Sequence, residues 1–376
     1  MYGEQLDYPV GLPYKSQVHL VGNFSHSDSF YETNTVERAA VPSPLRRAPT
    51  ELSATYSYQG ETRSLADYLA RNPTTGLLIA RDDTILFEHY QYDRTDRDRF
   101  LSNSMVKTIT AMLVGIAVEE GAIRSIDDPA QAYVPALENS ELGKTSIRAL
   151  LHMAAGIAFS EDYSGSDDSA KLYQSLMKQG SIEAVLQFNE RVAPPDTLWH
   201  YAGLNTQVLA LVLSNATHMT LARYLQTRVW QPMGAEADAK WAIDHSGLEI
   251  DYGNFNATLR DYARFGLLLA HDGAWNGHQI IPYQWLLDAT MPVSKGSFLA
   301  LDKQEHPWGY GYQVWLMPGP RRTFILQGIH GQRIFVDPQT RLVLVHTAVR
   351  LKPNKNPAEA ELIALWRSIL AQADKP

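Results

Sequence analysis

Residues 104–120 read Ser-Met-Val-Lys-Thr-Ile-Thr-Ala-Met-Leu-Val-Gly-Ile-Ala-Val-Glu-Glu, and Gly121 follows them. Apolar side chains recur in this segment at the spacing of an α-helix and extend around most of its circumference. Gly121 suits the C-terminal cap of such a helix. The segment therefore predicts a deeply buried central helix.

Strands are predicted on both sides of this helix along the chain. Residues 75–80 and 84–90 are two apolar segments separated by Arg-Asp-Asp, a pattern that predicts a β-hairpin. After residue 300 the pattern favours consecutive antiparallel strands at 310–316, 323–327, 332–336 and 341–347. A turn at 337–340 separates the last two strands, and residues 357–372 predict a closing helix.

The middle of the chain has mostly helical patterns, with candidate helices at 145–153, 168–179, 181–190, 203–216, 220–230 and 258–271. We therefore expect an α+β fold in which both chain ends form one antiparallel sheet flanked by helices. The expected parts are an irregular arm packed on the body (1–60), a sheet lobe (61–127 plus 271–376) and an inserted, mostly helical lobe (128–270).

Composition excludes several functional classes. The chain has 376 residues, a formal net charge of −8 and no cysteine, so disulfides and thiolate chemistry are ruled out. No basic run indicates nucleic-acid binding, and no apolar run is long enough to span a membrane. There is no His-Glu-x-x-His zinc pattern, and we expect neither a metal nor an organic cofactor. No leader is visible, so we expect a cytoplasmic or periplasmic protein; a homodimer is left open.

Ser104 and Lys107 carry the chemistry that the sequence suggests. They stand three residues apart at the start of the predicted helix, so one helical face brings a hydroxyl and an amine together. A serine is a weak nucleophile until a base takes its proton, and Lys107 can act as that base only when neutral. Burial and the positive end of the helix dipole both lower the pKa of such a lysine. A lone Ser-x-x-Lys also arises by chance with its lysine in solvent, but a solvated lysine is unnatural on this apolar helix.

Tyr201 provides a second polar group just before another predicted apolar helix. Its phenol can relay a proton between the serine oxygen and a leaving group. This role requires a lowered pKa, which a nearby ammonium can provide. Asn205, four residues later, is either part of the site or a helix-capping residue.

Four landmarks follow one another in the order and spacing of the serine beta-lactamase and penicillin-binding-protein superfamily. They are Ser104-x-x-Lys107, Leu151-His-Met-Ala-Ala-Gly156, Tyr201 with Asn205, and Arg260-Asp-Tyr-Ala-Arg-Phe-Gly266. The chain resembles the class C branch, which includes esterases, D-amino-acid peptidases and 6-aminohexanoate-dimer hydrolases, and it is most similar to the last group. The resemblance covers about residues 70–370, and it implies a beta-lactamase/transpeptidase-like fold.

The resemblance also implies roles for individual residues. Ser104 matches the acylated nucleophile, Lys107 its base and Tyr201 the residue that passes the proton to the leaving group. The oxyanion hole matches the backbone N–H groups of Ser104 and Ile329. The positions that match substrate-contacting residues, or that are candidates for substrate contact, are Tyr163, Asn205, Trp315 and His330.

One departure from the family pattern bears on the substrate. The beta-lactamase and peptidase members carry Lys-Thr-Gly or His-Thr-Gly where this chain has Leu326-Gln-Gly328, unless His330 or the earlier Lys295-Gly-Ser supplies the cationic group. The sequence therefore predicts a serine hydrolase that cleaves small carboxylic esters or linear amides through an acyl-enzyme. The alternatives are a beta-lactamase or D,D-peptidase, and a catalytically inactive binding protein on the same scaffold.

Overall fold

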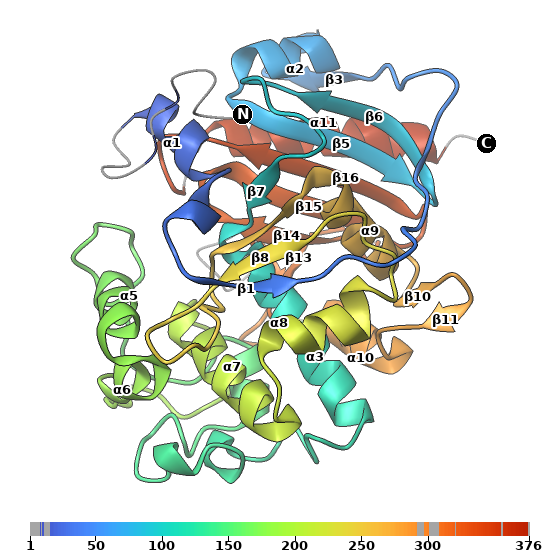
Figure 1. Cartoon of the computed structure of the whole chain (residues 1–376). Coiled ribbons are helices and arrows are strands. Elements are labelled where there is room, and N and C mark those ends of the chain that lie inside the picture. Colours follow the sequence, from blue (N-terminus) through green and yellow to red (C-terminus); the bar gives the residue numbers. More distant parts are fainter. Residues whose placement is uncertain are drawn as a thin grey trace.

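The computed structural model describes residues 8, 10, 16–291, 297–300, 308–319, 321–354 and 356–374. An eight-stranded sheet forms the upper half of the molecule (Figure 1). Its spatial order is β12 (Gly309–Tyr310), β13 (Trp315–Leu316), β14 (Phe324–Gly328), β15 (Gln332–Asp337), β16 (Leu342–Ala348), β5 (Thr74–Arg81), β6 (Thr84–Tyr90) and β2 (Arg46–Arg47). Every pair is antiparallel except β2 with β6.

The two ends of the chain meet at the centre of this sheet. Strand β16 pairs with β5 over almost its whole length, with Leu344 opposite Ile79. Both strands are buried on both faces, which explains their nearly continuous apolar composition. A buried seam between distant parts of the sequence is what the predicted fold requires.

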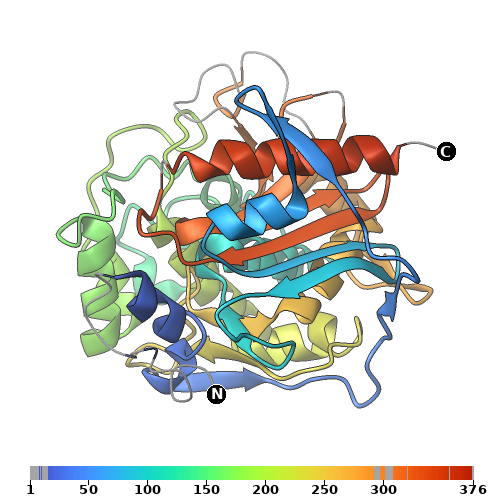
Figure 2. The ribbon, with the colours of Figure 1, turned by 90° about the horizontal axis from the view of Figure 1, so that it is seen from above.

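Helices cover both faces of the sheet. On one face, Trp366 of α11 (Ala358–Ala373) stacks on Phe335 of β15 with ring centroids 5.3 Å apart. This face also carries α2 (Leu65–Arg71), and Figure 2 shows both helices above the strands. On the opposite face, Gly266 of α9 (Leu259–Ala270) packs so closely on Val343 that an added Cβ would lie 2.7 Å from its side chain.

Helix α3 (Val106–Glu119) occupies the centre of the helical part of the molecule, next to α7 (Gly203–Thr217) and α10 (Tyr283–Thr290). It is buried from Val106 to Ala117, as its apolar circumference predicts. The remaining helices of this part are α4 (Ile147–Leu151), α5 (Asp168–Gln179), α6 (Ser181–Leu186) and α8 (Leu221–Leu225). A π-helical turn, Gln226–Trp230, extends α8.

A four-stranded sheet, which the sequence did not predict, connects the two parts. Its order is β1 (Thr33–Val36), β8 (Ala239–Ala242), β9 (Phe255–Thr258) and β7 (Arg99–Leu101). Thr33 pairs with Ala242, so part of the N-terminal arm is a strand of the body. Further elements are α1 (Gln17–Asn23), the hairpin β3 (Thr55–Tyr58) with β4 (Glu61–Ser64), and the hairpin β10 (Ala274–Trp275) with β11 (His278–Gln279).

Most of the predicted elements are confirmed, and one is wrong. The hairpin of residues 75–90, the six central helices, the strands after residue 322 and the closing helix all occur within a few residues of their predicted bounds. The predicted strand 310–316 is instead two two-residue strands, β12 and β13, which pair with each other. Gln313 between them has φ 55°, a left-handed conformation that reverses the chain. The division of the chain into lobes remains a prediction.

Candidate active site

Ser104 and Lys107 form a hydrogen-bonded pair at the entrance to α3. Ser104 lies in a 3₁₀ turn (Asn103–Met105) that leads directly into the helix, so the pair is separated by one helical turn. Lys107 Nζ lies 2.8 Å from Ser104 Oγ and 2.8 Å from the carbonyl oxygen of Tyr252. The carbonyl accepts one hydrogen of the amine, which directs Lys107 toward the serine oxygen.

The surroundings of Lys107 favour its neutral form. Its side chain is only 1% exposed, and burial lowers its pKa to about 8. Glu161 and Asp251 act in the opposite direction and raise this pKa. The predicted direction of the shift is therefore confirmed, and near neutral pH a useful fraction of Lys107 is an uncharged amine that can accept a proton.

Tyr201 stands beside this pair, immediately before α7. Lys107 Nζ lies 5.0 Å from the centroid of its ring, and Trp315 stacks on the same ring with centroids 5.7 Å apart. Burial raises the pKa of Tyr201 well above its ordinary value, Glu161 raises it further, and a hydrogen bond with Ser104 lowers it. The lowered pKa that the sequence analysis called for is therefore wrong, because burial makes the largest contribution to the shift. Because its pKa is raised, Tyr201 is a protonated phenol near neutral pH.

Ile329 lies next to the serine turn. It follows the end of β14, and its carbonyl accepts a hydrogen bond from Asn103 Nδ2 at 3.2 Å. The preceding Gly328 lies against the Ser102 carbonyl, where any Cβ would overlap. Glycine thus lets the strand end approach the serine turn closely. The structure brings Ser104 and Ile329 together, and their joint role as oxyanion hole remains a prediction.

The four candidate substrate-contacting residues have different surroundings. Trp315 lies on Tyr201, as described above. The hydroxyl of Tyr163 donates to Glu161 Oε1 at 3.0 Å, which places it at the edge of the same group. Asn205 is buried inside the first turn of α7, where its Nδ2 contacts Met153 Sδ at 3.5 Å, so it does not cap the helix.

His330 contacts residues outside this group. Its Nδ1 lies 2.6 Å from the carbonyl oxygen of Arg350, and its ring packs edge-to-face on Phe24. Burial lowers its pKa, which disfavours the imidazolium form. A neutral ring held by a backbone carbonyl supplies no cationic group for a substrate carboxylate. Lys295, the other candidate for that group, lies outside the described residues.

Two functional groups were missed at the sequence level. The first is the carbonyl oxygen of Tyr252, which accepts a hydrogen bond from Lys107 Nζ. No sequence pattern identifies a backbone oxygen in advance. The second is Glu161, whose Oε2 accepts the N–H of Gly203 at 2.6 Å, at the positive end of α7. Glu161 raises the pKa of Lys107, Tyr201 and Tyr163, and it directly precedes Asp162 and Tyr163 in the sequence.

Aromatic side chains form one wall of the site. Trp199 lies 5.6 Å from Trp315 and 5.6 Å from Tyr310 between ring centroids, and Tyr310 lies 5.0 Å from Trp315. Together with Tyr201, these rings provide a rigid apolar surface beside the hydroxyl–amine pair. Among the described residues, no group of three His, Asp or Glu side chains could hold a metal ion.

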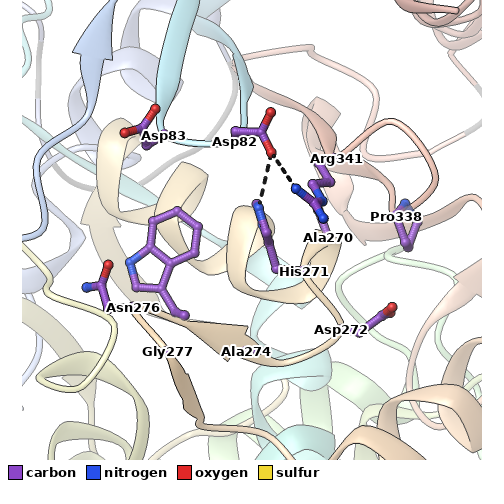
Figure 3. Close-up of a pocket in the computed structure, with 11 residues that line it drawn as sticks. Asp82, Asp83, Ala270, His271, Asp272, Ala274, Asn276, Gly277, Pro338 and Arg341 are labelled. Carbon is purple, nitrogen blue, oxygen red and sulfur yellow. Dashed lines mark hydrogen bonds and ion pairs between the residues drawn. The ribbon is translucent and has the colours of Figure 1, made fainter.

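A separate pocket of about 510 Å³ lies elsewhere in the molecule (Figure 3). The turns after β5, α9 and β15 contribute to it, and Asp82 Oδ1 lies 3.3 Å from His271 Nε2 and 3.3 Å from Arg341 Nη1. None of its lining residues belongs to the Ser104 group. Asp83 and Asp272 of this pocket pair with Arg46 and Arg322, so none of these groups contributes to the chemistry of Ser104.

A serine paired with a buried lysine at the start of a central helix, beside an antiparallel sheet, is typical of beta-lactamase/transpeptidase-like proteins. The family model described as Beta-lactamase matches residues 62–365, and the chain belongs to this family. The predicted fold class and family resemblance are thus confirmed. No helix within the described ranges has the length and apolar character needed to cross a membrane.

Particular relatives are similar to the chain over most of its length. The 6-aminohexanoate-dimer hydrolase of Paenarthrobacter ureafaciens is 27% identical over 296 residues, which cover 75% of this chain and 74% of that protein. The solved structure named "Putative 6-aminohexanoate-dimer hydrolase from Bacillus anthracis" has a TM-score of 0.85 at 22% identity and covers 96% of this chain and 95% of the other. A family VIII carboxylesterase has a TM-score of 0.62 at 17% identity and covers 80% and 93% of the two chains.

Proposed function

We propose that the protein is a serine hydrolase that cleaves small carboxylic esters or linear amides through an acyl-enzyme on Ser104. The observation that supports this most directly is the 2.8 Å contact between Ser104 Oγ and Lys107 Nζ, with the amine buried and its pKa lowered to about 8. A nucleophile and a base within hydrogen-bonding reach are the minimum that acyl transfer needs.

In the proposed acylation step, Lys107 takes the Ser104 proton as Oγ attacks the substrate carbonyl carbon. The backbone N–H groups of Ser104 and Ile329 stabilise the resulting oxyanion, and each such donor is worth about 3 kcal/mol. Tyr201 then gives its proton to the departing nitrogen or oxygen and recovers one from Lys107. Water completes the cycle by hydrolysing the Ser104 ester through the same groups in the reverse roles.

The surroundings of the site favour a neutral substrate over an anionic one. The imidazole of His330 is bonded to a backbone carbonyl, and Glu161 adds a carboxylate close to Tyr201. A substrate carboxylate next to Glu161 would be repelled. The relatives named 6-aminohexanoate-dimer hydrolase support a linear amide, and the aromatic wall suits an apolar acyl chain. Beta-lactams are net anionic, and their carboxylate lies next to the scissile amide, so they should be poor substrates. The linear 6-aminohexanoate dimer is neutral overall, and its carboxylate is separated from the amide by a methylene chain.

A substrate panel with the wild type and Ser104→Ala tests this proposal. We expect the wild type to hydrolyse p-nitrophenyl butyrate and the linear 6-aminohexanoate dimer, and to turn over nitrocefin slowly or not at all. Ser104→Ala should lose all of these activities while its circular dichroism spectrum is retained. Efficient nitrocefin turnover would favour a beta-lactamase, and stable labelling by a fluorescent penicillin would favour a D,D-peptidase. Unchanged ester hydrolysis by Ser104→Ala would contradict the assignment.

A further inference from the structure

Asp251 is a buried carboxyl that lies beside the catalytic group and has no part in the mechanism above. It is 0% exposed and precedes Tyr252, whose carbonyl receives Lys107. Its Oδ1 accepts a hydrogen bond from Thr110 Oγ1, whereas Oδ2 is buried with no hydrogen-bond partner in the part of the chain that the structure describes. A buried carboxyl oxygen without a hydrogen-bond partner lowers the stability of the fold, so the presence of Asp251 at this position calls for an explanation.

The segment that carries Asp251 connects the two helices of the site. Thr110 follows Lys107 by three residues, so both project from one face of α3 toward this segment. On the other side, the backbone N–H of Asp251 donates to Gln207 Oε1 at 2.9 Å, and Gln207 belongs to α7, the helix that follows Tyr201. These two bonds fix the position of the Tyr252 carbonyl between the helices.

The charges around the segment couple Asp251 to Lys107. The pKa of Asp251 is raised well above its ordinary value: burial is the largest cause and Glu249 adds to it, whereas the Thr110 hydrogen bond and Lys107 lower it. Glu161 and Asp251 are the carboxyls that raise the pKa of Lys107, and the rings of Tyr201 and Tyr252 are its aromatic neighbours. Two groups that influence each other in this way titrate as a pair.

We propose that Asp251 is a positioning residue for Lys107: with Thr110 and Gln207 it holds the Tyr252 carbonyl against the amine, and its carboxyl stabilises the ammonium that forms there. The proton concerned is the one that moves from Ser104 Oγ to Lys107 Nζ during acylation. This inference rests on the proposed function, in which Lys107 is the base.

Asp251→Asn tests the proposal because it keeps the shape of the side chain and removes its ability to ionise. Hydrolysis by neutral Lys107 rises with pH through the pKa of that lysine. Without the carboxyl, the acid limb of the kcat/KM profile for a p-nitrophenyl ester should move to lower pH by about one unit. We also expect kcat to fall by about tenfold, because the ammonium is less stabilised.

Asp244→Asn is the matched control. Asp244 is a buried aspartate, 4% exposed, that also accepts a hydrogen bond from a hydroxyl, that of Ser181, but it is not among the carboxyls that shift the pKa of Lys107. A variant that only weakens packing should lower the free energy of unfolding and leave the acid limb of the kcat/KM profile at its wild-type pH. We therefore expect Asp244→Asn to keep the wild-type pH profile.

An acid limb at the wild-type pH in Asp251→Asn would overturn the proposal. If Asp251→Asn does not fold, Thr110→Val replaces it. Loss of the Thr110 hydroxyl makes the Asp251 carboxyl less anionic, so the acid limb of the kcat/KM profile should also move to lower pH, by a smaller amount. An acid limb at the wild-type pH in Thr110→Val would likewise overturn the proposal. The proposed function fails separately, through activity of Ser104→Ala. An inactive Ser104→Ala together with an unmoved limb would refute the role of Asp251 alone.

Discussion

Lys107 Nζ lies 2.8 Å from Ser104 Oγ, and the helical backbone between the two residues sets this distance. Ser104 lies in the 3₁₀ turn directly before α3, and Lys107 lies in the first turn of α3. The distance between them therefore depends on local structure and not on a distant loop. The helix itself is buried, and it shields the amine from water. One local element therefore supplies both the contact and the lowered pKa of Lys107.

Removal of the amine should abolish turnover. Lys107→Ala leaves Ser104 without a proton acceptor, so kcat should fall by about 10³-fold or more. Steady-state hydrolysis of a p-nitrophenyl ester measures this loss. Lys144→Ala is the control, because Lys144 forms an exposed ion pair with Glu141 and should retain full activity. Equal rates for Lys107→Ala and the wild type would exclude Lys107 as the base.

The pH dependence follows from the state of Lys107. Only the neutral amine accepts the serine proton, and burial lowers its pKa to about 8. Activity should therefore rise as the pH increases through about 8 and decline below it, as measured by kcat/KM in buffers of constant ionic strength. A profile that is flat from pH 6 to 10 would be inconsistent with a lysine base.

Tyr201→Phe should affect amides more than activated esters. Burial and Glu161 raise the pKa of Tyr201, so the phenol is protonated and suited to donate to a departing amine. An amine cannot leave without a proton, whereas p-nitrophenolate can. We expect kcat to fall by about 10²-fold or more for a linear amide and by a smaller factor for the p-nitrophenyl ester. Equal losses on both substrates would argue against proton donation by Tyr201.

The helix that carries the pair tolerates no additional volume at Gly115. A methyl group there would overlap the indole of Trp285 on α10, which donates to the Ala111 carbonyl at 3.0 Å. Alanine favours a helix over glycine by about 1 kcal/mol, but overpacking a core costs about 1–3 kcal/mol, so Gly115→Ala should destabilise the protein. Urea denaturation measures the change. Gly253→Ala, where a methyl meets nothing within 4 Å, should leave the midpoint nearly unchanged.

Features encoded in neighbouring residues were predictable from the sequence. The apolar circumference of residues 104–120 identified α3, and the two apolar segments around residues 81–83 identified the β5–β6 hairpin. The i, i+3 spacing placed Ser104 beside Lys107. The direction of the Lys107 pKa shift followed from the same buried helix.

Features that depend on contacts between distant segments were not predictable. Strands β1 and β8 have four residues each and pair across some 200 positions, so no local pattern reveals them. The Tyr252 carbonyl acts through its backbone, which any residue would provide. The raised pKa of Tyr201 results from burial under rings, including Trp315, that tertiary packing brings together.

Covalent labelling tests the central assignment most directly. The wild type and Ser104→Ala are treated with a fluorophosphonate probe, which reacts with activated serines, and the labelled peptide is identified by tandem mass spectrometry. The structure predicts one adduct on Ser104, its absence from Ser104→Ala, and much slower labelling of Lys107→Ala. An adduct on a different serine, or equal labelling of all three proteins, would contradict a nucleophilic Ser104 activated by Lys107.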